Sequence, residues 1–167
     1  MGIHIDIYGI TDYRNKEVIE LFIAEFTDRS SVEDRGDEEL MILNDTTHEQ
    51  TASDDYTWIK AETLTKAIET GLADASTCFT LYLGSDQPEI EQAMISFTLD
   101  GKLILGLSIE AFADKDGTIS NSPLAEKLAI RLQETFHCRK TYYETELPSA
   151  HTEAEFYTAW LRNKDIG

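Results

Sequence analysis

The residues of this chain that could do chemistry are four histidines, two cysteines and a large set of carboxylates. The nearest approach to a metal-ligand spacing is His151 with Glu155, which are four residues apart and would share one face of a helix, where they could hold a metal ion. Acidic side chains are also favoured at the positive end of a helix dipole, and we judge that interpretation the stronger one. We therefore predict no metal site.

Other catalytic and cofactor-binding patterns are missing from the sequence. The chain has nine glycines but no Gly-rich phosphate loop, no Walker motif and no Gly-x-Ser-x-Gly turn. Cys78 and Cys138 lie in or beside apolar runs, which is typical of buried thiols. Chance pairs are inevitable among 32 acidic residues, so paired carboxylates are uninformative. We predict no catalytic residue, no cofactor and a protein that is not an enzyme.

Charge is the most informative property of the sequence. There are 32 Asp and Glu residues against 14 Lys and Arg, a formal net charge of -18. Such a field repels nucleic-acid phosphates and anionic lipid, and it speeds association with basic proteins. No apolar run reaches the roughly 20 residues that span a bilayer, and the N-terminus does not read as a signal peptide. We predict a cytoplasmic protein with no nucleic-acid or membrane partner.

One segment concentrates this charge. Residues 28–55 hold ten acidic and two basic residues, and the aromatic residues Tyr56 and Trp58 follow directly. Clustered unpaired carboxylates predict an exposed acidic face, and nearby aromatic side chains are typical anchors at protein interfaces. We predict a partner-binding surface formed by Glu33, Asp34, Asp37, Glu38, Glu39, Asp54, Asp55, Tyr56 and Trp58.

Periodicity predicts the elements that must position these residues. Period-2 alternation predicts strands, and apolar residues three and four apart predict helices. Asp100-Gly101 is the strongest hairpin signal and favours a type I′ turn. Ser122-Pro123 is typical of a helix cap followed by proline, and Thr152 with Glu155 forms a capping box. The predicted strands are 3–9, 40–43, 77–83, 92–99, 102–112 and 138–145, the predicted helices are 15–26, 61–73, 122–137 and 152–162, and 56–59 is either a strand or the approach to a helix.

This order predicts one α+β domain over residues 1–167. We expect a mixed or mainly antiparallel sheet with a central hairpin and about four helices packed on it, because consecutive elements usually lie side by side. The alternative is a three-layer α/β sandwich, in which the first strand and helix form a crossover unit.

Size, acidity and the lack of motifs favour a binding function. We expect an acidic protein-binding inhibitor, specifically a bacterial immunity protein that neutralises a basic, nuclease-like toxin domain. The alternatives are a small enzyme with a dispersed carboxylate and histidine site, and an acidic oligomeric adaptor domain. A deep pocket with convergent His and carboxylate groups would favour the enzyme, and a self-complementary apolar face would favour the oligomer. The sequence leaves the oligomeric state open.

Overall fold

The computed structural model describes residues 3–43, 56–113, 115–117, 119–145 and 149–163. Strands and helices mix along the chain, and the sequence predicts most of them within a few residues. The elements are β1 (Ile3–Thr11), α1 (Lys16–Phe26), α2 (Arg29–Val32), β2 (Glu39–Leu43), β3 (Tyr56–Lys60), α3 (Leu64–Ala73), β4 (Phe79–Gly84), β5 (Ile90–Phe97), β6 (Leu103–Ala113), β7 (Ile119–Ser120), α4 (Ser122–Phe136), β8 (Lys140–Thr145) and α5 (Glu153–Asn163).

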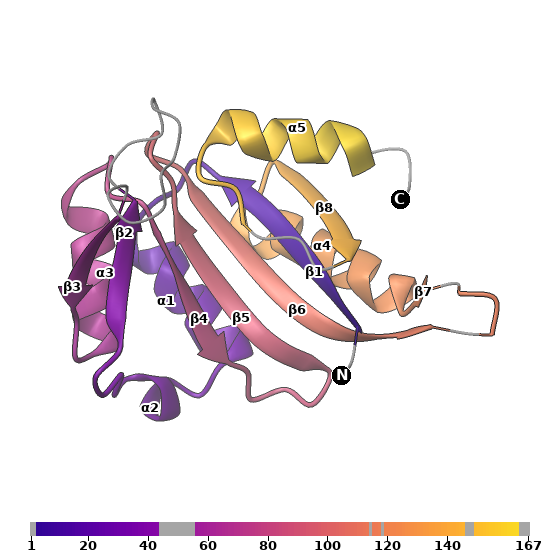
Figure 1. Ribbon diagram of the computed structural model, residues 1–167, viewed down its shortest axis with the longest axis horizontal. Coiled ribbons are helices and arrows are strands. Elements are labelled where there is room, and N and C mark those ends of the chain that lie inside the picture. Colours follow the sequence, from indigo (N-terminus) through magenta and orange to yellow (C-terminus); the bar gives the residue numbers. More distant parts are fainter. Residues whose placement is uncertain (1–2, 44–55, 114, 118, 146–148, 164–167) are drawn as a thin grey trace.

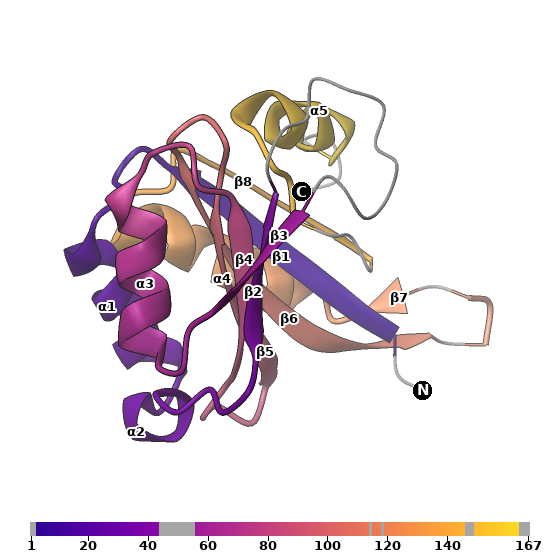
Figure 2. The same ribbon diagram turned by 60° about the vertical axis from the view of Figure 1, so that its left-hand side comes forward.

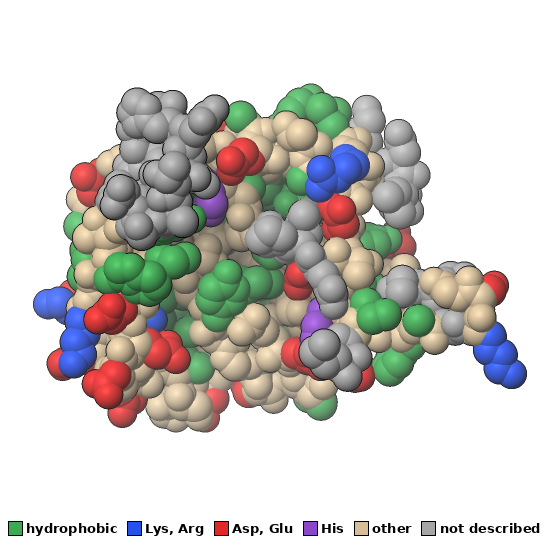
Figure 3. All heavy atoms as spheres, in the orientation of Figure 1, with side chains coloured by type: hydrophobic (Ala, Val, Ile, Leu, Met, Phe, Trp, Pro, Cys, Tyr) green, Lys and Arg blue, Asp and Glu red, His purple; other side chains and the backbone are tan. Residues whose placement is uncertain are grey.

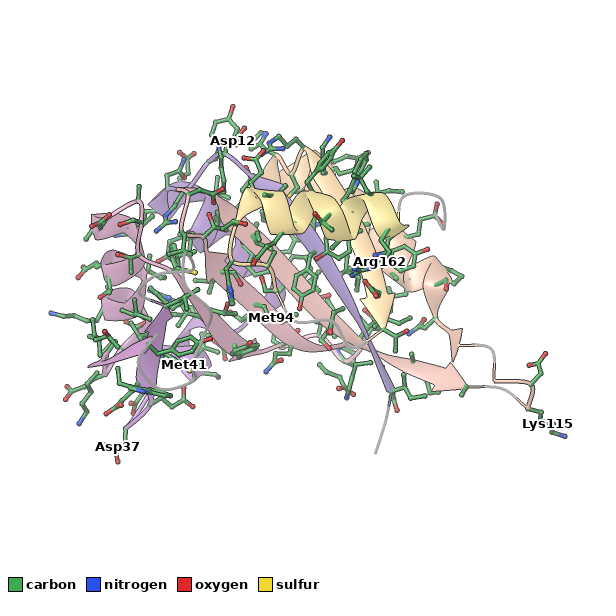
Figure 4. All side chains as sticks on the ribbon, turned by 45° about the horizontal axis from the view of Figure 1, so that its top comes forward. Asp12, Asp37, Met41, Met94, Lys115 and Arg162 are labelled. Carbon is green, nitrogen blue, oxygen red and sulfur yellow. The ribbon has the colours of Figure 1, made fainter. Side chains whose placement is uncertain are left out.

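The main sheet has the strand order β4-β5-β6-β1-β8, and every pair in it is antiparallel. β7 pairs with the end of β6, and the two project from the body as a hairpin arm that carries Lys115 (Figure 1, Figure 4). β2 and β3 form a separate antiparallel ribbon. The predicted α+β class, mainly antiparallel sheet and central hairpin are confirmed, and the α/β sandwich is excluded. None of the described helices is both long and apolar enough to cross a membrane.

The sheet has a heavily covered face and a partly covered face. Helices α1, α3 and α4 lie on one side, whereas α5 lies across part of the other (Figure 1, Figure 2). Alternation along β6 explains the division: Leu103, Leu105 and Leu107 enter the large core under α1 and α4, while Ile104 enters a smaller cluster with Phe156 of α5. Two unequal hydrophobic clusters therefore hold the sheet.

Gly106 lies in the centre of the partly covered face, where a side chain would not fit. A Cβ there would lie 2.8 Å from ring atoms of Tyr8 and 3.1 Å from Cε of Met94. The pairing register places Tyr82, Met94, Gly106 and Tyr8 in one row across four strands. Glycine in a strand often marks a place where another group packs closely against the backbone. At Gly106 that group is the Tyr8 ring.

The β5–β6 turn differs from the prediction. A type I′ turn needs positive φ at both central residues, but only Gly101 has it, at 82°, and Asp100 does not. The hairpin closes instead between Thr98 and Lys102: Thr98 N donates to Lys102 O at 3.1 Å, and Lys102 N donates to Thr98 Oγ1 at 2.7 Å. The Thr98 hydroxyl replaces a backbone acceptor, so the turn is one residue longer than a two-residue loop.

Two helix starts also differ. Helix α3 begins at Leu64 rather than 61, because Thr63 is extended and its side chain accepts from Lys66 N. Helix α4 is preceded by Asn121 in the left-handed region, at φ 102°, so Ser122 lies inside the helix and is not its cap. The predicted cap of α5 is confirmed, since Thr152 Oγ1 accepts from Glu155 N at 3.1 Å.

Arg14, in the loop after β1, ties three distant segments together. Its guanidinium lies over the Phe97 ring, 5.0 Å from the centroid. Burial lowers the pKa of this guanidinium, and Asp74 and Asp100 oppose that effect. Five backbone carbonyls accept from it, those of Gly71, Asp74, Thr77, Thr98 and Lys102. The end of α3, the approach to β4 and the β5–β6 turn are thereby fixed relative to one another.

Candidate functional site

An isolated β-bridge at the end of β2 joins the β2–β3 ribbon to the main sheet. Leu43 N donates to Cys78 O at 2.8 Å, which forms an isolated antiparallel bridge just before β4. Between the ribbon and the partly covered face of β4 and β5 lies a groove of about 590 Å³, within the size range of ligand pockets. Its lining residues are Arg35, Glu38, Glu39, Met41, Leu43, Tyr56, Trp58, Cys78, Phe79, Thr80, Tyr82, Gln92, Ser149 and His151.

Alternation along β2 sends side chains to both sides of the ribbon. Leu40 and Ile42 are buried in the main core, while Glu39 and Met41 face the groove. Trp58 lies directly opposite Met41 on β3. Trp58 is 60% exposed and Met41 is 45% exposed. On this face of the molecule, hydrophobic side chains gather over the ribbon and the neighbouring sheet, with carboxylates beside them (Figure 3).

The floor of the groove is the partly covered face of the sheet. Tyr82 on β4 is 58% exposed and lies opposite Met94 on β5, which is the next residue of the row toward the sheet centre. Thr80 lies two residues before Tyr82 on the same face of β4, and its hydroxyl is 2.8 Å from the Ser96 hydroxyl. The floor therefore combines one exposed aromatic ring with hydroxyl groups.

The far wall, formed by Ser149 and His151, is fixed by backbone hydrogen bonds. His151 O accepts from Leu99 N at 2.9 Å, and His151 N donates to Glu155 Oε2 at 2.7 Å. The ribbon is attached to the body because Leu43 N donates to Cys78 O and because Leu40 and Ile42 are buried in the main core. Both walls are thus held in place, which is typical of a preformed binding site.

Three of the predicted acidic residues stand at the start of the ribbon. Glu38 and Glu39 line the groove, and Asp37 lies at its outer end (Figure 4). Asp37 is 3.6 Å from Lys60 Nζ, and Glu38 is 3.5 Å from Arg35 Nη2. Within the part of the chain that the structure describes, Glu39 makes no ion pair.

The other predicted acidic residues are placed elsewhere. Glu33 pairs with Arg29 at 3.3 Å and accepts from the Thr65 hydroxyl and backbone at the start of α3. Asp34 Oδ1 accepts from Gly36 N at 2.9 Å and so shapes a local turn. Asp54 and Asp55 lie outside the described residues. The structure therefore brings together Glu38, Glu39, Tyr56 and Trp58 in one groove, with Asp37 beside it.

The thiol that lines the groove is not activated as a nucleophile. Burial raises the pKa of the Cys78 thiol to about 12, against a weaker opposing effect of Arg14, so the thiol stays protonated at neutral pH. Burial also raises the pKa of Tyr82, and Asp6 adds to that shift. No group of three or more potential metal ligands occurs among the described residues. Exposed rings, a thioether and carboxylates suit the groove to binding.

Sequence reasoning missed several residues that line the groove. Tyr82 carries a usable signal, because it is an aromatic residue in the polar phase of the alternating strand Phe79–Gly84. Met41 lies in a continuous apolar run, between Leu40 and Ile42, so the sequence pattern does not distinguish this exposed residue from its buried neighbours. His151 joins the site only through tertiary contacts, which no local pattern indicates.

Comparisons with known proteins gave no match: no family model, no curated protein and no solved structure matches the chain. What the groove binds must be inferred from its own side chains.

Proposed function

We propose that this chain is an acidic inhibitor that binds a basic protein partner in the groove beside the β2–β3 ribbon. Its biological role would be that of a bacterial immunity protein, which neutralises a nuclease-like toxin domain in the cytoplasm. The observation that carries the proposal is the exposed Met41–Trp58 pair with carboxylates next to it. An apolar centre with a charged rim is the usual anatomy of a protein interface.

The apolar centre supplies the anchors. Tryptophan and tyrosine are the residues most enriched among interface hot spots, and Trp58 and Tyr82 both line the groove while exposing more than half of their surface. Large exposed apolar side chains that gather in a concave region mark interaction sites more often than scattered ones do. A partner side chain that fills the groove would remove both rings from water.

The acidic residues beside the groove and the net negative charge of the chain would attract a basic partner and speed its association. Asp37, Glu38 and Glu39 follow one another at the groove, and the net charge of the chain is -18. Complementary charge raises association rates and suppresses wrong partners more than it raises affinity. An inhibitor of a toxin must bind before the toxin acts, so fast association is the property that such a charge supports.

Growth protection tests the proposal. We expect the gene of this chain to adjoin one for a larger secreted protein with a basic C-terminal domain. Production of that domain alone should arrest bacterial growth, and co-production of this chain should restore it. Trp58→Ala should lose protection, whereas Ile130→Ala, which shortens an exposed side chain on α4, should keep it. Continued arrest in the presence of the folded wild-type chain would contradict the proposal.

A further inference from the structure

The groove face of the ribbon holds a carboxylate and an indole at a defined spacing. Glu39 and Met41 point to the same side of β2, because alternate residues of a strand share a face. Trp58 is the cross-strand partner of Met41. Glu39 is therefore the diagonal neighbour of Trp58, at a separation of about 7–8 Å in an antiparallel pair. One planar cation can span that gap.

The cations nearest to Glu39 are already engaged. Lys60, directly opposite Glu39, lies 3.6 Å from Asp37 and 3.8 Å from Glu62. The Arg35 side chain is only 9% exposed and donates to Ala61 O and toward Glu38. Among the described residues none pairs with Glu39, so its charge is open to a group from outside the chain.

We propose that Glu39 and Trp58 form a receptor for an arginine side chain of the basic partner. This inference rests on the proposed function and names the chemistry that the groove recognises. The guanidinium would lie over the indole and donate to the Glu39 carboxylate. Guanidinium is planar, weakly hydrated and able to donate two parallel hydrogen bonds, so it satisfies both contacts at once.

The structure favours arginine over lysine. An ammonium group is a compact, strongly hydrated point charge that cannot stack on a ring while it binds a carboxylate bidentately. Met41 and Tyr82 line the same groove and would exclude water from the bound cation, which strengthens its electrostatic contacts. The groove is lined by two carboxylates, those of Glu38 and Glu39, and by one guanidinium, that of Arg35. A second cation from the partner would therefore balance the charge of the groove.

Nuclear magnetic resonance with two short peptides tests the receptor. The probes are acetyl-Gly-Gly-Arg-Gly-Gly-amide and the same peptide with lysine, titrated at equal ionic strength. The readout is the indole N–H signal of Trp58, assigned with Trp58→Phe, and the signal of Trp160 serves as internal reference. We expect the arginine peptide to shift the Trp58 signal and to bind at least about threefold more tightly than the lysine peptide.

Two charge-matched variants complete the test. Glu39→Gln should abolish the preference for the arginine peptide. Glu126→Gln, which changes an exposed side chain on α4, should keep that preference. Equal binding of the two peptides, or equal behaviour of the two variants, would overturn the inference, because net charge alone would then explain binding. Full growth protection by Glu39→Gln, with none by Trp58→Ala, would overturn the receptor while supporting the inhibitor.

Discussion

Met41 and Trp58 lie directly opposite each other across the β2–β3 ribbon, and both side chains are exposed to solvent. Cross-strand pairs of this kind normally stabilise a sheet by covering each other against a core. Here the core side of the ribbon is supplied by Leu40 and Ile42, so the Met41–Trp58 pair is left on the groove side. The ribbon therefore presents an exposed apolar surface on its groove side.

Truncation of the indole should shorten the life of the complex. Trp58→Ala is expected to raise the dissociation rate of the basic partner, by about 2 kcal/mol of binding free energy if Trp58 is a hot spot. The association rate should change little, because the mutation leaves every charge in place. Surface-based kinetics with the purified partner domain measures both rates.

The control is Ile130→Ala, which shortens an exposed apolar side chain on α4, away from the groove. It should leave both rates unchanged. A similar rise in dissociation rate for the two variants would show that the groove is not the contact.

Gly106 should be intolerant of any side chain. Gly106→Ala places a methyl group 2.8 Å from the Tyr8 ring, so the free energy of unfolding should fall by about 1–3 kcal/mol. Gly84→Ala is the control, because nothing lies within 4 Å of a Cβ at the end of β4. Urea unfolding curves of the two variants give the comparison. Equal stabilities would mean that Tyr8 does not pack against β6 as described.

The sequence predicted the main sheet well because its strands alternate. Ile5 and Ile7 on β1 and Leu103, Leu105 and Leu107 on β6 repeat with period two, and each of these side chains enters the large core. That pattern is local, so it can be read without knowledge of the neighbouring strands. Type and approximate extent were therefore correct for these elements.

The β5–β6 turn and the starts of α3 and α4 were predicted less well, because tertiary contacts and alternative hydrogen bonds decide them, whereas the Thr152 cap of α5 is confirmed. Asp100-Gly101 has the composition of a type I′ turn, but the Thr98 hydroxyl accepts from Lys102 N and shifts the closing pair. Asn121 enters the left-handed region, and its side chain donates to Glu110 O rather than capping α4. Neither competing partner is visible in local propensity.

The candidate site was half predictable. Composition identified the acidic segment and the aromatic residues after it, and Glu38, Glu39, Tyr56 and Trp58 do line one groove. The opposite side of that groove comes from β4, β5 and the residues before α5, which are distant in sequence. Glu33 illustrates the converse, since a carboxylate that composition assigns to a surface is used to hold α3 to Arg29.

Arg14 should contribute more to stability than an ordinary surface arginine. Arg14→Met leaves the carbonyls of Gly71, Thr77 and Thr98 without their donor, and we expect a loss of about 2–4 kcal/mol in the free energy of unfolding. Arg131→Met is the control, since the half-exposed Arg131 side chain pairs with Glu25, and its loss should cost less than that of Arg14. Thermal and urea unfolding measure both. Equal losses would contradict the role of Arg14.

The buried thiols should make stability depend on alkaline pH. Burial raises the pKa of Cys78 and of Cys138 from the usual 9.0 to about 12, so the native state favours the protonated thiol. This stabilisation is fully present below pH 9 and is lost as pH rises from 9 toward 12, because the unfolded chain releases its protons first. The slope should be about 1.4 kcal/mol per pH unit for each thiol.

Unfolding free energies at pH 7, 9 and 10 measure that slope, and a thiol reagent at pH 8 supplies an independent reading. Both cysteines should stay unmodified in the native protein and react once it is unfolded. Rapid modification of the native protein would mean that at least one thiol is accessible and less strongly shifted.

The salt dependence of association with the partner tests the central claim most directly. The variant is the triple charge reversal Asp37→Lys, Glu38→Lys and Glu39→Lys, and the control reverses Glu126 and Glu134 on α4 together with Glu69 on α3. Stopped-flow traces across a salt series should show steep slowing for wild type and control. The groove variant should associate at least about tenfold more slowly at low salt, with a flatter dependence. Identical rates for both reversals, or wild-type association that ignores salt, would contradict a groove that steers a basic partner.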